Sequence, residues 1–71
     1  MRKVLKERRL ALGMSQDVVA EKLGIVRAHY TRIENGTSNP SIRVYFKLKE
    51  ILDLTDEEFM LEDENPPRKA G

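Results

Sequence analysis

The chain has 71 residues and no cysteine, so we expect a single domain without disulfides or thiolate metal sites. Residues 1–54 hold 11 Lys and Arg against 6 Asp and Glu, whereas residues 55–71 hold 2 against 6. A basic body suits a polyanionic partner, although this charge is also ordinary for a protein surface. No segment approaches the roughly 18 apolar residues of a membrane span, and the N-terminus lacks a signal-peptide run. We therefore expect a cytoplasmic protein without a membrane partner, metal or cofactor.

A first helix is predicted over residues 2–12. Leu5, Arg9 and Leu12 recur at helical spacing, so these side chains should face the core. Gly13 follows and can end the helix in the left-handed conformation.

Two further helices are predicted around a glycine turn. Ser15 is a good N-cap for a helix over residues 16–23, and Gly24 can make the sharp turn to a helix over residues 27–35. Val26 precedes the latter helix and offers no side-chain acceptor. Its first amides therefore face water or an anionic ligand.

A fourth helix is predicted over residues 40–52, with Asn39 as N-cap and Pro40 in the first helical position. Its apolar face is predicted to consist of Ile42, Tyr45, Phe46, Leu48, Ile51 and Leu52.

A capping box between Thr55 and Glu58 predicts a fifth helix over residues 56–61. Residues 63–71 have no apolar anchor and are predicted to be a disordered tail, which leaves residues 1–62 as the folded domain. Five helices with short connections and no strand pattern predict a compact all-α bundle.

Residues 15–36 resemble the helix-turn-helix of the phage repressor and Cro family, also called the xenobiotic-response-element type of bacterial regulator. The resemblance rests on Gln16, Ala20, Gly24 and Ile33, followed by Ile33-Glu34-Asn35-Gly36 and Asn39-Pro40-Ser41 at the family spacing. It covers about residues 3–60. It implies a lambda-repressor-like domain whose third helix enters the major groove of DNA.

Three positions depart from the family pattern. Val26 stands where the family usually has Ser or Thr, which removes a helix cap. Tyr30 replaces an aliphatic residue, so its hydroxyl needs solvent or a hydrogen-bond partner. Arg8 replaces a leucine, which questions how tightly the first helix packs.

The resemblance implies that exposed residues early in the third helix contact DNA bases. Arg27 and Arg32 are favoured, because a guanidinium bonds guanine bidentately, while a phosphate contact is the alternative for each. Val26 or Ala28 can pack on a thymine methyl group. His29 can donate to guanine, lie beside a phosphate, or simply be solvated. The expected base contacts are Val26, Arg27, Ala28, His29 and Arg32.

Polar residues on both sides of this helix are expected to contact DNA phosphates, with a solvated loop as the alternative for those after it. The expected phosphate contacts are Ser15, Gln16, Asn35, Thr37, Ser38, Asn39 and Arg43. The resemblance also implies a structural salt bridge between Arg9 and Glu34. Small members of the family commonly pair through the C-terminal end, where dimerisation is expected at Leu54, Phe59, Met60 and Leu61.

We therefore expect a sequence-specific, double-stranded DNA-binding transcriptional regulator of a bacterial or phage-infected cell. The favoured form is a repressor that binds a pseudo-palindromic operator as a homodimer. The alternative is an antitoxin or adaptor whose main role is to bind a protein partner such as a toxin or a regulator. An enzyme is least expected, because the chain has one histidine and no glycine-rich phosphate loop.

Overall fold

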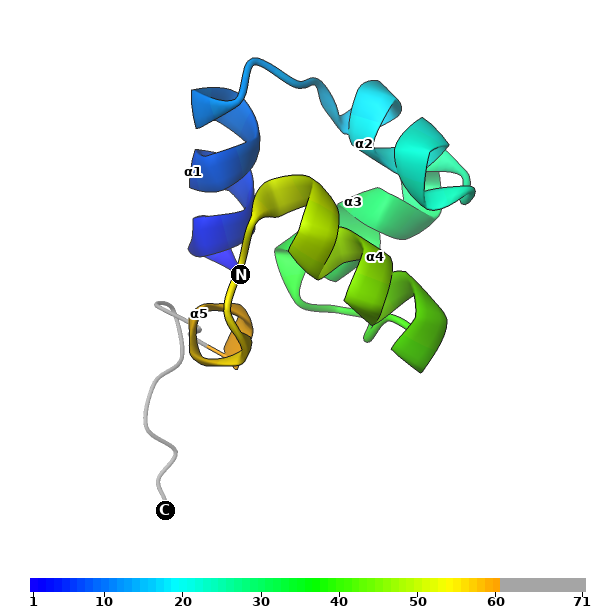
Figure 1. Ribbon diagram of the computed structural model, residues 1–71. Coiled ribbons are helices and arrows are strands. Elements are labelled where there is room, and N and C mark those ends of the chain that lie inside the picture. The colour runs from blue at the N-terminus through cyan, green and yellow to red at the C-terminus, as the bar shows by residue number, and fades with distance from the viewer. Residues whose placement is uncertain (61–71) are drawn as a thin grey trace.

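The computed structural model describes residues 1–60, which form five helices and no strand within that range (Figure 1). The helices are α1 (Lys3–Ala11), α2 (Gln16–Leu23), α3 (Arg27–Asn35), α4 (Ile42–Leu52) and α5 (Asp56–Met60). The all-helical prediction is confirmed. The predicted tail over residues 63–71, and Leu61 at the predicted end of the fifth helix, lie outside the described residues.

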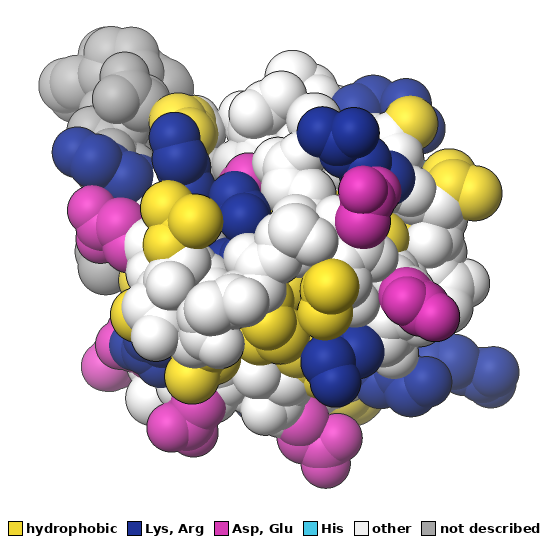
Figure 2. Space-filling model, turned by 90° about the horizontal axis from the view of Figure 1, so that it is seen from above, with side chains coloured by type: hydrophobic (Ala, Val, Ile, Leu, Met, Phe, Trp, Pro, Cys, Tyr) yellow, Lys and Arg dark blue, Asp and Glu magenta, His cyan; other side chains and the backbone are white. Residues whose placement is uncertain are grey.

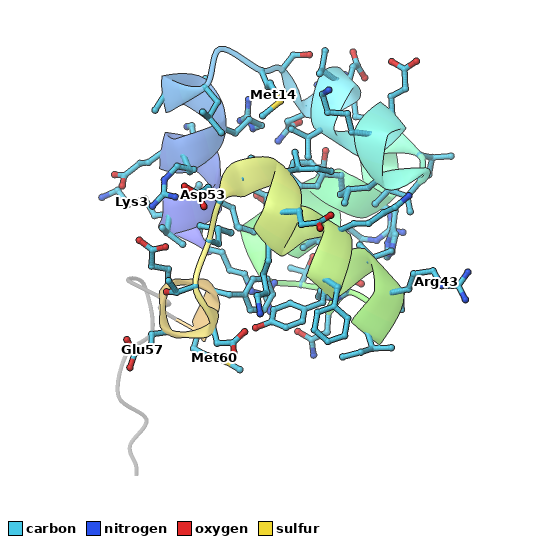
Figure 3. The ribbon with its side chains drawn as sticks, viewed as in Figure 1. Lys3, Met14, Arg43, Asp53, Glu57 and Met60 are labelled. Carbon is cyan, nitrogen blue, oxygen red and sulfur yellow. The ribbon has the colours of Figure 1, made fainter. Side chains whose placement is uncertain are left out.

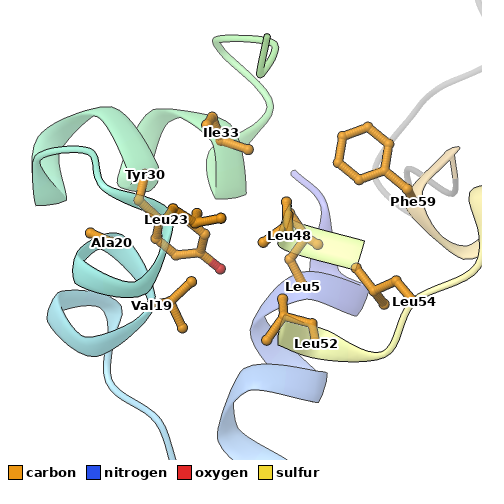
Figure 4. Packing of buried hydrophobic residues seen from close by; sticks show 10 residues of the cluster. All are labelled: Leu5, Val19, Ala20, Leu23, Tyr30, Ile33, Leu48, Leu52, Leu54 and Phe59. Carbon is orange, nitrogen blue, oxygen red and sulfur yellow. The ribbon is translucent and has the colours of Figure 1, made fainter. Parts of the chain in front are cut away.

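All five helices contribute to one core. α2 packs against α3 and α4, while α1 packs against α3, α4 and α5. Burial of a leucine or isoleucine side chain stabilises the fold by about 1.5–3 kcal/mol. Figure 4 shows the buried apolar residues between the helices: Leu5, Val19, Ala20, Leu23, Tyr30, Ile33, Leu48, Leu52, Leu54 and Phe59.

α1 is one residue shorter at each end than predicted, and this changes the place of Leu12. The helix ends at Ala11, and Gly13 takes a left-handed conformation with φ +75°. The helical period that would have carried Leu12 inward is therefore broken, and its side chain is 49% exposed. The prediction that Leu12 faces the core was wrong, whereas Leu5 and Arg9 are buried as expected.

The boundaries of α2 and α3 are those predicted from capping. The Ser15 Oγ accepts a hydrogen bond from the Val18 amide at 3.1 Å. Gly24 ends α2 with φ +77°. This left-handed conformation is energetically less favourable for a residue with a Cβ than for glycine. Val26 makes no side-chain cap bond to α3 and is 70% exposed.

α4 begins two residues later than predicted. Its N-cap is Ser41, whose Oγ accepts from the Val44 amide at 3.3 Å. Asn39 is not the cap, because its side-chain oxygen accepts a hydrogen bond from Arg2 at 2.6 Å and is held in the preceding loop. The apolar stripe of α4 is also wider than the surface that its neighbours cover, so Ile42 and Phe46 are exposed.

The predicted capping box of α5 is confirmed. The Thr55 amide donates to Glu58 Oε1 at 3.0 Å, and the Glu58 amide donates to Thr55 Oγ1 at 3.1 Å. The hydrogen bond from the Thr55 backbone, together with the nearby Arg8, holds the pKa of Glu58 below its usual value.

Arg8 joins the C-terminal end of α4 to α5. Its guanidinium donates to the Leu52 carbonyl at 3.0 Å, to the Asp53 carbonyl, and to Glu58 Oε2 at 2.8 Å. The arginine in place of a leucine therefore binds the last carbonyls of α4 instead of loosening α1. Within residues 1–60, no helix is long and apolar enough to cross a membrane.

Candidate nucleic-acid interface

The start of α3 presents an exposed surface. Val26, Arg27, Ala28 and Arg32 are exposed, while His29 is half-buried. Of the five residues expected to contact bases, four lie in α3 and Val26 is its N-cap, and all are at least partly accessible. The Nε of Arg27 lies 3.7 Å from Asp17 Oδ1, but both side chains are largely exposed. Such a pair is weak in water, so Arg27 remains able to bind another partner.

An open groove lies beside this surface, where the end of α1 meets the starts of α2 and α3. Its volume is about 510 Å³. Arg27 and residues of the turn after α1 contribute to its lining. The lining residues are Arg9, Leu10, Gly13, Met14, Ser15, Gln16, Asp17 and Arg27.

A buried ion pair fixes the inner side of α3. Arg9 Nε lies 2.9 Å from Glu34 Oε2, and Arg9 Nη2 donates to Glu34 Oε1 at 3.3 Å. A further guanidinium nitrogen donates to the Met14 carbonyl at 3.0 Å. The hydrogen bond with Glu34 raises the pKa of Arg9, and both partners are almost completely buried. The pair links α1 to the last turn of α3.

Tyr30 adds a third group to this pair. Its ring is fully buried, and its hydroxyl donates to Glu34 Oε2 at 3.1 Å. Burial raises the pKa of the Tyr30 hydroxyl, which therefore stays protonated and remains a donor. The hydroxyl that replaces an aliphatic group in the family pattern is thus satisfied inside the protein.

Gln16 connects the same carboxylate to the outer part of α3. Its Nε2 donates to Glu34 Oε1 at 2.6 Å, and its Oε1 accepts from the Thr31 hydroxyl at 3.1 Å. An amide nitrogen carries two hydrogens, so one remains for an external acceptor such as a phosphate. Gln16 therefore braces α2 against α3, and the expected phosphate contact depends on its second hydrogen.

The other residues expected to contact phosphates lie near the two ends of the helix-turn-helix. Ser15 precedes α2, and its oxygen already caps that helix. In the segment after α3, the Thr37 hydroxyl donates to the Arg32 carbonyl at 3.3 Å. The first turn of α4 carries an exposed Arg43, which extends away from the bundle (Figure 3). Asn35 ends α3, and the segment that follows carries Thr37, Ser38 and Asn39. Of these four residues only Ser38 is half-buried, and the others are exposed.

Arg2 has a structural role that the sequence did not indicate. It was assigned only to the start of the first helix, but it precedes α1 and is 4% exposed. Its guanidinium donates to the Ile33 and Ser38 carbonyls at 2.6 and 3.2 Å, and to Asn39 Oδ1 at 2.6 Å. These partners lie 31 to 37 residues away, so no local pattern could have indicated them.

Two residues expected at a dimer surface belong to the core of the single chain. Leu54 and Phe59 are buried, because α5 folds back against α1. The Phe59 ring packs edge-on against the Tyr45 ring, with 4.8 Å between the ring centres. Both side chains are therefore covered within the single chain. Met60 is 70% exposed and lies beside the exposed Ile42 in an open groove of about 420 Å³. Leu61 is outside the described residues.

Charged side chains of both signs share the surface. Figure 2 shows Lys and Arg interspersed with Asp and Glu, with apolar side chains between them, on the face seen from above. This mixture agrees with the net charge of +1. This face is therefore not uniformly basic.

The comparisons with known proteins agree with this geometry. The sequence model of the helix-turn-helix (HTH) family matches residues 5–59. The chain belongs to the HTH family of DNA-binding transcriptional regulators. The uncharacterized HTH-type transcriptional regulator YqaF of Bacillus subtilis (strain 168) is 52% identical over 52 residues, which cover 73% of this chain and 68% of that protein.

An uncharacterized HTH-type transcriptional regulator of Archaeoglobus fulgidus is 34% identical over 65 residues, which cover 90% of this chain and 93% of that protein. A second regulator of that organism, described in the same words, is 30% identical over 64 residues, with 90% of each chain covered. No solved structure matches the chain. The residues matched by the family model include α2 and α3, the two helices joined by the turn at Gly24.

Proposed function

We propose that this HTH protein is a sequence-specific repressor that inserts α3 into the major groove of a pseudo-palindromic operator as a homodimer. The observation that carries the proposal is the contrast within α3. Its inner side is fixed by the buried Glu34 and Tyr30, while its outer side exposes Arg27 and Arg32. A helix held this firmly can present guanidinium groups to base edges without a large ordering cost.

The proposed contacts divide into two groups by chemistry. Val26, Arg27, Ala28, His29 and Arg32 would read bases from the groove. The polar groups at the start of α2 and after α3 would fix the position of the domain on the backbone, which carries no sequence information. The members of this second group are Ser15, Gln16, Asn35, Thr37, Ser38, Asn39 and Arg43.

The proposed dimer would place two α3 helices about 34 Å apart, one turn of B-DNA. Met60 and Ile42 are exposed apolar residues that line the open groove of α4 and α5, so they are the proposed centre of the contact. The same exposed apolar groove also suits an antitoxin or adaptor, in which it would bind another protein.

Selection of bound duplexes from a random pool tests the proposal. We expect two inverted half-sites whose centres are separated by about 10 base pairs or a multiple of that spacing, which reports base reading and the dimer together. Recovery of sequences without any shared half-site would contradict specific repression and favour the antitoxin or adaptor. Recovery of a single, unrepeated half-site would contradict the homodimer.

A further inference from the structure

We infer that Arg2 is a positioning residue, which sets the shape of the segment 36–39 before this segment meets the DNA backbone. The inference rests on the proposed function, because the phosphate contacts of that segment are part of it. Arg2 itself is buried and therefore does not reach a phosphate. Its role is to act through the groups that it holds.

The guanidinium of Arg2 joins three parts of the chain. One nitrogen donates to the Ile33 carbonyl in the last turn of α3 and to the Ser38 carbonyl, and the other donates to the Asn39 side chain. The two bonds of 2.6 Å are short, as expected for a charged donor. A planar fork reaches these directions at once, whereas a lysine ammonium on a flexible stem does not.

The backbone of the N-terminus contacts the same region. The Arg2 amide donates to the Glu34 carbonyl at 2.9 Å. A Cβ on Gly36 would lie 3.4 Å from the Met1 nitrogen, so the first residue rests directly on the turn after α3. Figure 1 shows the N-terminus at the end of α3, next to the connection to α4. Residues 1 and 2 therefore support the start of segment 36–39 through both backbone and side chain.

α5 supports Arg2 from the opposite side. The guanidinium carbon lies 4.8 Å from the centre of the Phe59 ring, a distance at which a cation is attracted to an aromatic face. Arg2 is thus held between α5 and the segment that it orders. Without Arg2, the segment would have to be ordered at the moment of binding, and the lost conformational entropy would weaken affinity for every duplex alike.

Arg8 offers a matched control. It also comes from the N-terminal part of the chain, also donates to carbonyls near the end of a helix, and carries the same charge. Its partners Leu52 and Asp53 lie at the C-terminal end of α4, whereas the proposed phosphate contact Arg43 lies in the first turn of that helix (Figure 3). Replacement of either arginine removes one charge and its bonds to carbonyls near a helix end, and replacement of Arg8 also removes its ion pair with Glu58. Of the two arginines, only Arg2 touches segment 36–39.

The experiment compares the Arg2→Gln, Arg2→Lys and Arg8→Gln variants of the full chain. Binding to one fixed duplex of about 20 base pairs is measured at several salt concentrations, since phosphate contacts need no particular sequence. The temperature is chosen so that circular dichroism shows each variant to be folded. Amide hydrogen exchange is followed at Thr37 and Ser38, which both donate to the Arg32 carbonyl.

We expect Arg2→Gln to weaken binding about tenfold, the equivalent of ordering roughly one residue, and Arg8→Gln by less than about threefold. Arg2→Lys should recover only part of the loss. Exchange at Thr37 and Ser38 should rise more in Arg2→Gln than in Arg8→Gln. The slope of log affinity against log salt should be the same in both glutamine variants, because neither arginine meets a phosphate.

Three results would overturn the inference. Equal weakening by Arg2→Gln and Arg8→Gln would assign Arg2 to general stability. A salt slope shallower by about 0.9 in Arg2→Gln than in Arg8→Gln would mean that Arg2 binds a phosphate directly. Full recovery by Arg2→Lys would show that charge alone matters. If the unaltered protein bound no duplex, the proposed function would fail, while the exchange rates of Thr37 and Ser38 would still decide whether Arg2 orders the segment.

Discussion

The inner and outer sides of α3 differ in how firmly their side chains are held. On the inner side, Glu34 accepts hydrogen bonds from Arg9, Gln16 and Tyr30, and each of these groups lies on a different helix or a different turn. On the outer side, the exposed Arg27 has one loose contact with Asp17. A side chain held in several bonds fixes a position, whereas an exposed one is available to a partner. Substitutions on the inner side should therefore mainly lower stability. Substitutions on the outer side should mainly alter DNA recognition.

The largest effect is expected from breaking the Arg9–Glu34 pair. Arg9→Met should lower the free energy of unfolding by about 3–5 kcal/mol, because Glu34 would remain buried without its main counter-charge. The double variant Arg9→Met with Glu34→Leu should lose less than this, since no buried charge is stranded. Urea unfolding of both proteins measures the difference. Equal losses would show that burial of the carboxylate is not the cause.

The corresponding change on the outer side is Arg32→Ala. If Arg32 reads a guanine, this variant should lose about 1–3 kcal/mol of discrimination at one position of the selected half-site. Its melting temperature should hardly change, because Arg32 is exposed. Lys6→Ala, which removes an exposed charge from α1, is the matched control. Affinity that falls equally for all sequences would assign Arg32 to a phosphate.

A smaller effect on the inner side is expected from Tyr30→Phe. The ring and its packing are kept, but Glu34 loses one donor, which should lower the free energy of unfolding by about 0.5–1.5 kcal/mol. Thermal unfolding monitored by circular dichroism measures this change. DNA specificity should stay as in the unaltered protein. A stable variant with altered specificity would contradict the separation of the two sides.

The smallest effect lies outside α3 and depends on pH. The pKa of Glu58 is lowered in the folded protein, so its contribution to stability is present above the ordinary value of 4.5 and is lost as pH falls through the lower folded pKa. Glu58→Gln should therefore flatten the fall of melting temperature between about pH 5 and about pH 3. If the melting temperature of Glu58→Gln fell with decreasing pH as steeply as that of the unaltered protein, the loss of stability would come from other carboxylates. Asp56 is one of these, because its pKa is also lowered by Lys49 and Tyr45.

Local signals account for what the sequence predicted well. The caps at Ser15 and at Thr55 with Glu58, and the turn at Gly24, depend on residues three or four positions apart. A family pattern added the pairing of Arg9 with Glu34, which lie 25 residues apart. Neither the local signals nor the family pattern indicates where the N-terminal residues pack.

Several differences between prediction and structure share one physical cause, which is contact between distant segments. Asn39 was predicted to cap α4, but its side chain is bound by Arg2, 37 residues away. Leu54 and Phe59 looked like surplus apolar surface, but α5 closes over α1 and buries them. The role of Arg2 was absent from the prediction for the same reason.

Amide chemical shifts of the protein titrated with its selected duplex test the central claim most directly. The two-sided view of α3 predicts the largest changes at residues 26–32, 36–39 and 43, and small ones at Ile42 and Met60 beyond the effect of dimerisation. Changes confined to the groove around Ile42 and Met60, with residues 26–32 unaffected, would contradict it and would indicate that this surface serves a protein partner instead.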